Sequence, residues 1–541
     1  MKDISSTGSF VDFTLENFIY VDKTVYIPQL VKLKRVFISR PRRFGKSLTL
    51  DTIATLFETG VEPYFKGTWI YDKWTEPTYP VLRLNFLNFD KNTLEKFNNK
   101  LNSKITEFAE LNQVTTYKEK EEAEDSIDHL LEQLRLEGRQ IVILIDEYDC
   151  QMTANINNET LYKQFQEKIK SFYANIKDKF AIKFLGITGV TRLKDVSIFS
   201  VGSDINDITN ASAYSQMIGF TRDEIKKYYI DYLKLASSYE NNCSVDDVTD
   251  TQLESMLDMM AQNYDGYCFD EDYEKKVFST WSVNKFFQTM IEKKKVQFGE
   301  YWYDNGGLPS ILVNYLKTHE LNIFEYLDKD KFLKVSSDDF KNPTALTTIN
   351  QNVLMCQTGY LTLRSDLNKT STVALGIPNG EIYKALNRLL ANNIFKGNTD
   401  ITDDYGRSLL EVGTVDDIIN LFNSALNSVS YDNYPIVSES SVQNMLKLYL
   451  LGAHQKVLSE LHEAKGRADL VVNTDNRRIV FEFKYAKNEA EAKSKLSEAV
   501  EQIKTRDYGN ILPKKNELIR IAAVFNADPK VRAFTENQIV P

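Results

Sequence analysis

Apolar residues along this chain of 541 residues follow two patterns, each typical of a different structural element. Apolar runs at 36–38, 141–145 and 184–190 predict buried strands, and an apolar–polar alternation predicts a further strand at 81–86. Between them, helical patterns lie at residues 26–34, 48–57, 93–137 and 159–177. Strands that alternate with helices predict a parallel α/β sheet in the first part of the chain.

After residue 220 the pattern becomes mainly helical. Thr221 and Glu224 have the spacing of a capping box at the start of a helix. Two aromatic loops, at 263–269 and 301–304, suit either base stacking or packing between helices, and packing is favoured. A short strand is expected at 358–363.

The last hundred residues return to strands. A helix at 441–451 precedes strand patterns at 456–461 and 479–485, and a helix follows at 488–504. Between the two strand patterns, a further strand is expected to begin or end at Asp469. Because one hydrophobic core does not extend over a chain of this length, several domains are expected. We expect their bounds at 1–220, 221–345, 346–435 and 436–541, the second being a helical lid.

Gly45-Lys46-Ser47 follows the first buried strand and opens a helix, which is the layout of a phosphate-binding loop. Backbone N–H groups at a helix start attract an anion, and Gly45 allows a close approach. Lys46 would reach the terminal phosphates, and Ser47 would hold Mg²⁺. The neighbours Arg43, Phe44 and Leu48 complete the expected nucleotide loop. The consensus G-x-x-x-x-G-K-[ST] has its first glycine where this chain has Arg40.

A second motif, Asp146-Glu147, ends the buried strand at 141–145. An acidic pair in this place is typical of ATPases with a phosphate-binding loop, so Asp146 is expected to hold the metal and Glu147 to polarise the attacking water. Thr188, at the end of the next strand, and Arg192 are candidates for contact with the γ-phosphate. Both also suit an ordinary role at a strand end.

A third motif combines Asp469 with Glu482 and Lys484. Residues two apart on a strand point to the same face, and a carboxylate and a lysine in an apolar strand are costly unless they are used. Two carboxylates that hold Mg²⁺ beside a lysine suit phosphodiester cleavage. The alternative is a salt bridge between Glu482 and Lys484 on an edge strand.

Overall composition is ordinary for a globular protein, with 42% hydrophobic and 26% charged residues. The chain holds 66 Lys and Arg against 76 Asp and Glu, whereas residues 436–541 hold 17 against 14, the sign that a DNA-facing domain needs. The four cysteines form no metal or disulfide pattern. No apolar run approaches the ~20 residues of a membrane span, so a cytoplasmic protein without a membrane partner is expected.

The motifs together resemble a large family of bacterial proteins with an N-terminal AAA-like ATPase domain and a C-terminal domain of the PD-(D/E)XK nuclease superfamily. The resemblance implies a P-loop (AAA-like, additional-strand) core with a helical lid and a restriction-endonuclease-like α/β domain. It also implies that Arg40 is the family's own pattern, that Glu439 joins the metal site, and that Gln502 is the glutamine of the second helix. The matching stretches are residues 20–24, 40–47, 144–149, 188–192, 219–221, 357–361, 466–469 and 481–484.

We therefore expect an ATP- and Mg²⁺-dependent enzyme that cleaves nucleic acid, with DNA as the expected substrate, in defence or mobile-element biology. One alternative is a nucleotide-switched scaffold whose nuclease-like domain binds DNA or a protein without cutting. Another is an ATPase that acts on a protein partner. Whether a second subunit completes the nucleotide site, as in a homo-oligomer, stays open.

Overall fold

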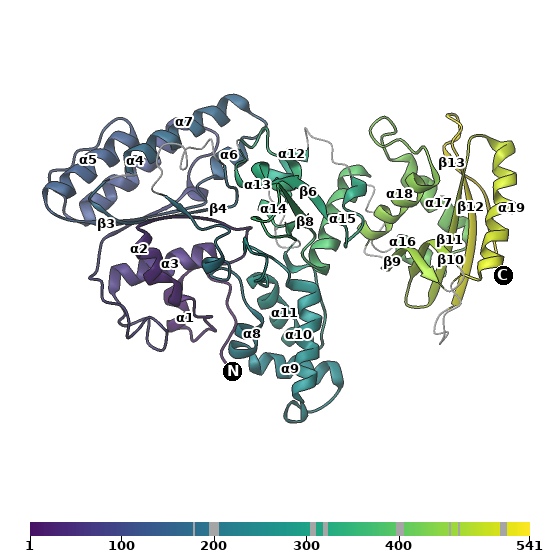
Figure 1. The fold of residues 1–541 in the computed structure, drawn as a ribbon, viewed down its shortest axis with the longest axis horizontal. Helices are drawn as coiled ribbons and strands as arrows, with labels where there is room; N and C mark the ends of the chain where they lie inside the picture. The colour runs from purple at the N-terminus through teal and green to yellow at the C-terminus, as the bar shows by residue number, and fades with distance from the viewer. Residues whose placement is uncertain are drawn as a thin grey trace. The chain divides into compact units, whose positions relative to one another are not determined.

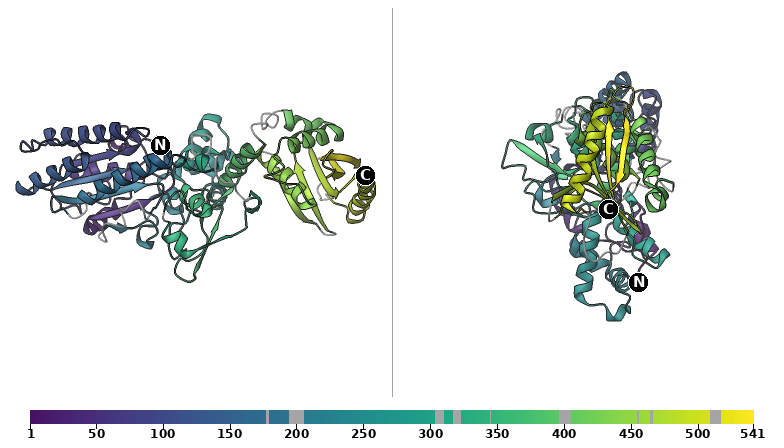
Figure 2. Two further views of the ribbon diagram at one scale, coloured as in Figure 1. Left: turned by 90° about the horizontal axis from the view of Figure 1, so that it is seen from above. Right: turned by 90° about the vertical axis from the view of Figure 1, so that its right-hand side faces the viewer.

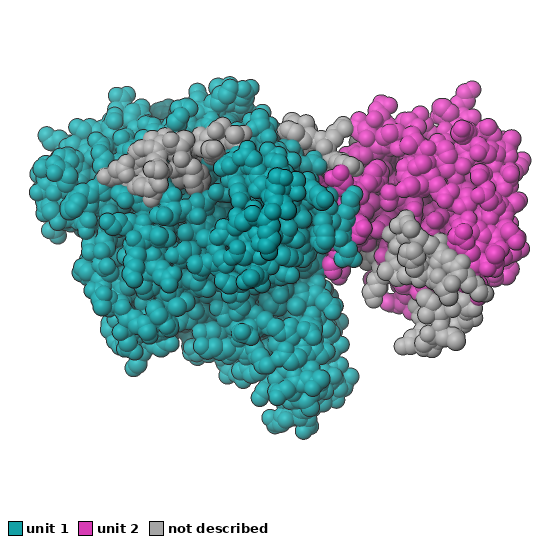
Figure 3. Space-filling model, viewed as in Figure 1, with its two compact units in different colours: residues 1–321, 330–382 teal, residues 322–329, 383–541 magenta. Residues whose placement is uncertain are grey.

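The computed structural model describes residues 1–176, 179–193, 205–302, 310–316, 323–343, 345–395, 405–453, 456–463, 466–508 and 517–541. The chain divides into two compact units, which Figure 3 distinguishes by colour. The first unit contains residues 1–321 and 330–382, and the second contains 322–329 and 383–541. The finer domain bounds expected from the sequence stay predictions.

The first unit is built on a five-stranded sheet with the order β2-β3-β4-β1-β5, in which all neighbouring strands are parallel. The predicted parallel α/β sheet is therefore confirmed. Because β4 lies between β1 and β3, the strand that leads to Gly45 and the strand that ends in Asp146 are not neighbours. The strands are β1 (Arg35–Ser39), β2 (Val81–Asn85), β3 (Ile141–Asp146), β4 (Ile182–Gly189) and β5 (Asn206–Asp207).

Helices cover both faces of this sheet, which is why β3 is buried along its whole length and apolar up to its last residue, Asp146. In Figure 1, α4, α5 and α7 lie above the strands, and α2 and α3 lie below them. The helices are α1 (Phe10–Leu15), α2 (Ile27–Leu33), α3 (Lys46–Thr59), α4 (Leu94–Leu111), α5 (Ala123–Leu136), α6 (Cys150–Ala154) and α7 (Glu159–Ile176).

A helical subdomain follows, with its own core of buried aromatic and aliphatic side chains. Its first helix has the predicted capping box: Glu224 N–H donates to Thr221 Oγ1 at 3.2 Å, and Thr221 N–H donates to Glu224 Oε2 at 2.8 Å. The helices are α8 (Arg222–Tyr228), α9 (Ile230–Asn241), α10 (Asp250–Tyr264) and α11 (Thr280–Lys293), and the next helix, α12 (Ser310–Leu316), contacts α6.

A small antiparallel sheet with the order β6-β8-β7 completes the first unit. The strand expected at 358–363 is shorter than predicted, because a helix continues to Thr358 and Gly359 ends it in a left-handed conformation. The elements are β6 (Leu333–Ser336), α13 (Ser337–Lys341), α14 (Gln351–Thr358), β7 (Thr362–Leu363), β8 (Thr372–Gly376) and α15 (Gly380–Ile394), and the boundary between the units falls within α15.

The second unit contains a five-stranded mixed sheet with the order β13-β12-β11-β10-β9. Only β11 and β12 pair in parallel, and α19 packs against both of them. In the right view of Figure 2, this yellow-green helix lies beside the yellow strands. The strands are β9 (Lys456–Glu463), β10 (Gly466–Asn473), β11 (Arg477–Ala486), β12 (Glu517–Asn526) and β13 (Ala533–Ile539). The helices are α16 (Tyr405–Val412), α17 (Val415–Asn427), α18 (Glu439–Gly452) and α19 (Glu489–Arg506).

Two sequence placements need correction in this unit. Glu439 was expected just before its helix, but it is the first residue of α18, because Ser438 caps the helix by accepting from Ser441 N–H. Asp469 was expected at a strand end, but it lies inside β10 next to the pair Leu470↔Phe481. Asp469 therefore faces the strand that carries Glu482.

Candidate functional sites

The loop between β1 and α3 has the backbone of an anion site. Gly45 caps α3 with a φ of 102°, and Arg43 also has a positive φ of 68°. Only glycine adopts such angles without strain, and the turn exposes the first N–H groups of α3. This start of α3 is thus suited to a phosphate group.

Arg40 explains why the first glycine of the consensus is absent. Its guanidinium is fully buried, donates to Ser39 O at 2.9 Å and to Thr209 O at 2.6 Å, and lies 4.2 Å from the centre of the Phe269 ring. Burial lowers the pKa of Arg40 to about 9. The Arg40 side chain therefore fixes the start of the loop to the backbone of residues 39 and 209 and to the Phe269 ring.

Lys46 lies at the centre of the loop and is almost completely buried. Its Nζ donates to Arg40 O at 3.0 Å and to Pro41 O at 3.2 Å, and it lies 3.6 Å from Glu147 Oε1. Burial raises the pKa of Glu147, although the Lys46 charge opposes this shift. The two predicted residues are thus side by side.

Asp146 joins two other predicted residues. Ser47 Oγ donates to Asp146 Oδ2 at 2.6 Å, and Thr188 Oγ1 donates to the other carboxylate oxygen. The three residues meet because the carboxyl ends of parallel strands lie at the same edge of the sheet. Arg192 lies elsewhere: it forms an ion pair with Asp207, and its N–H donates to Gln357 Oε1 at 3.3 Å.

A cavity of about 320 Å³ opens in front of this loop. The predicted loop residues from Arg43 to Leu48 line it, as does Glu147, whereas Arg192 is not among its described lining residues. The segment before β1 lines it too, through Tyr20 and Ile27.

The segment before α2 contains a short 3-10 helix, which begins at Thr24. Among the described residues, the structure shows no side-chain cap at this helix or at α2; instead Asp22 Oδ1 accepts from Thr24 N–H at 2.9 Å. It also places the segment on the cavity wall.

The far wall of the cavity consists of residues that sequence reasoning missed. The Arg43 guanidinium lies over the Trp281 ring, 4.3 Å from the ring centre. Tyr229 Oη donates to Asn284 Oδ1 at 2.6 Å. The sequence offered little indication that these residues line the cavity, because they lie far from the loop in the chain and in a region whose helical pattern predicts only packing. Thr280 Oγ1 also donates to Arg43 O at 2.9 Å.

The aromatic loops pack, as was favoured. The Tyr267 and Phe269 rings meet the Phe44 ring edge-on, with centroids 4.7 and 5.6 Å away. Trp302 is buried and its Nε1–H donates to Arg42 O at 3.3 Å. Packing therefore supports the phosphate loop from the helical side.

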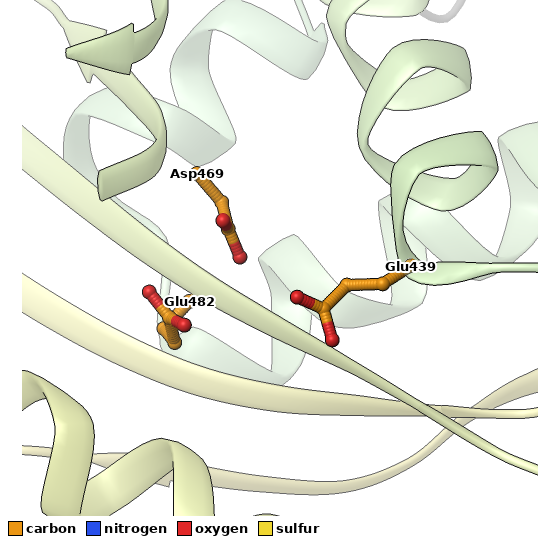
Figure 4. Close-up of side chains that lie close together, drawn as sticks. All are labelled: Glu439, Asp469 and Glu482. Carbon is orange, nitrogen blue, oxygen red and sulfur yellow. The ribbon is translucent and has the colours of Figure 1, made fainter. Parts of the chain in front are cut away.

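Three carboxylates converge in the second unit, as Figure 4 shows. Glu439 comes from α18, Asp469 from β10 and Glu482 from β11, and one ligand oxygen of each lies within 4.8 Å of the others. Glu482 is fully buried, and its Oε2 has no hydrogen-bond partner. Burial, with the Asp469 charge, raises the pKa of Glu482 to about 7. A buried oxygen without a partner in an acidic cluster is suited to a cation.

Lys484 completes the cluster. Its Nζ lies 2.9 Å from Glu482 Oε1 and 3.3 Å from Glu439 Oε1. Burial alone would lower the pKa of Lys484, but the hydrogen bond and charge of Glu482 outweigh it and raise this pKa. Since β11 lies between β10 and β12, the alternative of an edge-strand salt bridge is wrong.

Two glutamines differ in their relation to this cluster. Gln443 was not predicted, yet it lies one turn after Glu439 and its amide donates to Asp469 O. Asp469 Oδ2 also accepts from Phe483 N–H at 2.8 Å. The predicted Gln502 donates instead to Tyr508 Oη at 3.4 Å, and among the described residues no hydrogen bond joins it to the carboxylates.

Comparison with known proteins agrees with this division. Residues 5–199 match the family described as "Predicted AAA-ATPase", and residues 437–535 match the PD-(D/E)XK nuclease superfamily. Together with the parallel sheet, these matches confirm the expected fold class: an α/β ATPase-like core and a C-terminal PD-(D/E)XK domain. No helix in the described ranges is long and apolar enough to cross a membrane.

The chain is 26% identical over 533 residues to an uncharacterized protein in the vnfD 5′ region of Azotobacter chroococcum mcd 1, covering 95% of this chain and 94% of the relative. Among solved structures, a Walker-type ATPase of Pyrococcus abyssi is similar with 11% identity and a TM-score of 0.36, covering 67% of this chain and 94% of that one. Cdc6p of Pyrobaculum aerophilum has 10% identity and a TM-score of 0.21, covering 68% and 91%.

Proposed function

We propose that the protein binds and hydrolyses ATP with Mg²⁺ at the loop of Gly45 and Lys46, and cleaves phosphodiester bonds of nucleic acid, expected to be DNA, at the Glu482 cluster. The observation that carries the second half is the buried Glu482 oxygen without a partner, set among two further carboxylates and a lysine. The match to a nuclease superfamily over residues 437–535 supports it.

The first unit fits a nucleotide in three respects. A cavity of about 320 Å³ adjoins the start of α3, the loop backbone takes left-handed angles, and the Lys46 ammonium lies at the loop centre. Ser47 and Asp146 would hold Mg²⁺, which would supply positive charge to neutralise the phosphates.

The remaining residues take roles that follow from their places. Glu147 adjoins Lys46 and lines the cavity, which suits polarising a water. Thr188 holds one oxygen of Asp146 and so fixes the carboxylate. Arg192, paired with Asp207, keeps only an indirect role in this proposal.

The second unit fits one divalent metal ion, held by Asp469 and Glu482 with Glu439 as a third ligand. When bound, Mg²⁺ supplies charge neutralisation at the scissile phosphate and an acidified water. Phe483 N–H keeps one Asp469 oxygen in place, and Lys484, between Glu482 and Glu439, would position the attacking water. Gln502 on α19 would orient its neighbours through Tyr508.

The test is cleavage of plasmid and linear DNA by the purified chain with Mg²⁺ or Mn²⁺, with and without ATP, beside Asp469→Ala. Asp475→Ala is the matched control, because Asp475 lies in the exposed turn between β10 and β11. Cleavage that depends on metal and Asp469 but not on Asp475 supports the proposal. A wild-type protein that cuts neither DNA nor RNA under any of these conditions contradicts it.

A further inference from the structure

A groove of about 670 Å³ opens at the edge of the parallel sheet where the strands begin. Arg35 is the first residue of β1, Ile182 is the first of β4, and Gln140 directly precedes β3. The nucleotide loop follows the opposite end of β1. The strand has five residues at ~3.3 Å each, so its two ends are about 17 Å apart. The groove is therefore separate from the cavity in front of Gly45.

Positive charge is concentrated in this groove, although the chain as a whole is acidic. Among the described residues of its lining, Glu76 has the only carboxylate, which is 2.7 Å from Lys183. Lys179 is paired with Asp128. The six cationic residues of the lining are Lys32, Lys34, Arg35, Lys73, Lys179 and Lys183.

The two lysines at the end of α2 are available for a ligand. Lys32 and Lys34 are exposed, and neither has an ion-pair partner in the described part of the chain. Uncompensated cations in a concave surface raise the local concentration of anions. A polymer with regularly spaced negative charges is the ligand that several such cations can bind at once.

Aromatic rings accompany the charges. Phe180 is 68% exposed, which is unusual for a ring of its size, and its carbonyl accepts from Gln140 Nε2 at 2.9 Å, which holds the backbone in place. Trp74 also lines the groove and packs on Phe57, with ring centroids 5.3 Å apart. An exposed ring beside cations is the combination on which unpaired bases stack.

We propose that this basic groove binds single-stranded nucleic acid, with Lys32 and Lys34 on its phosphates and Phe180 against a base. A duplex keeps its bases stacked inside, so none of them is available to stack on Phe180. An acidic peptide would form ion pairs with the lysines but would not need contact with the Phe180 ring. The proposal does not depend on cleavage at the Glu482 cluster, because the groove belongs to the first unit.

The test measures binding of the full chain to a labelled mixed-sequence single strand of about 20 nucleotides by fluorescence anisotropy, in EDTA, over a range of salt concentrations. Lys32→Ala/Lys34→Ala should lower the slope of log affinity against log salt by about 1.4 in magnitude, at ~0.7 for each phosphate. Phe180→Ala should weaken binding at least about fivefold and leave the slope unchanged. A photo-crosslinking strand should label the peptide that contains Phe180.

The matched control is Lys96→Ala/Lys100→Ala, which removes two exposed lysines of α4 outside the groove and should leave the slope as in the wild type. An unchanged slope in Lys32→Ala/Lys34→Ala, or crosslinks confined to residues 436–541, would overturn the proposal. A third contradicting outcome is tight binding of polyglutamate that is lost in Lys32→Ala/Lys34→Ala and unchanged in Phe180→Ala. This result would identify the ligand as an acidic peptide. Since no divalent metal is present, none of these outcomes depends on whether the protein cleaves.

Discussion

Ser47 and Asp146 are 99 positions apart in the chain, yet Ser47 Oγ donates to Asp146 Oδ2 at 2.6 Å. The bond joins the first turn of α3 to the end of β3, across the strand β4 that separates β3 from β1. Thr188, at the end of β4, holds the second carboxylate oxygen. The side chains expected to hold Mg²⁺ are thus already oriented by hydrogen bonds, which is how second-shell partners fix ligands.

Lys46→Ala is expected to abolish ATP binding, because it removes the ammonium at the centre of the loop and leaves the half-buried Glu147 without its partner. Glu147→Gln should still bind ATP but hydrolyse it slowly, since the amide cannot polarise water. Calorimetry and phosphate release measure the two effects. Equal ATP binding by the wild type and Lys46→Ala would show that this loop is not the nucleotide site.

Thr188→Val should retain ATP binding and lose about 10- to 100-fold in hydrolysis or Mg²⁺ affinity, because the Asp146 carboxylate loses a hydrogen-bond donor. The matched control is Thr191→Val, which breaks a bond to Asp149 and leaves Asp146 untouched. Mg²⁺ titrations of ATPase activity separate the variants. Equal losses in both would indicate a general effect on folding.

Arg40→Gly restores the consensus glycine, yet we expect it to destabilise the first unit by about 2–4 kcal/mol, since buried hydrogen bonds to a charged group are lost along with packing on Phe269. Denaturant unfolding measures the change. As a control, Arg135→Ala removes an exposed ion pair with Glu132 and should leave the unfolding midpoint nearly unchanged. An Arg40→Gly protein as stable as the wild type would contradict the supporting role of Arg40.

Asp469→Ala should remove cleavage together with metal binding, because the remaining carboxylates cannot hold a hard cation against its hydration shell. Lys484→Ala should leave metal and DNA binding largely intact and still remove cleavage, since its role is in the transition state. Isothermal titration with Mn²⁺ beside cleavage assays distinguishes the two. If both substitutions change only DNA affinity, the second unit is a binding module.

Gln443→Ala is expected to lower metal affinity about 10- to 100-fold, because its amide holds the Asp469 backbone against α18. Gln502→Ala should have a milder effect, since its amide contacts Tyr508 and not the carboxylates. Comparing Mn²⁺ titrations of the two variants checks this order. A larger loss of metal affinity in Gln502→Ala than in Gln443→Ala would contradict this order and would mean that Gln502 acts on the metal site directly, and not through Tyr508.

Local pattern determined much of this protein in advance. The apolar run before Gly45, the buried run before Asp146 and the period-two placement of Glu482 and Lys484 are short-range features, because strand and helix periodicities depend on neighbouring residues. They predicted the parallel sheet and the central position of β11, and they identified residues that do lie together, such as Lys46 with Glu147.

Tertiary structure alone decided which distant residues meet these motifs. Trp281 and Asn284 reach the cavity in front of Gly45, and Gln443 reaches Asp469, through packing of helices whose sequence pattern shows only an apolar face. Arg192 turns to Asp207, a partner set by the pairing of β1 with β5. Such contacts depend on how elements far apart in the chain stack together, and local periodicity carries no information about that arrangement.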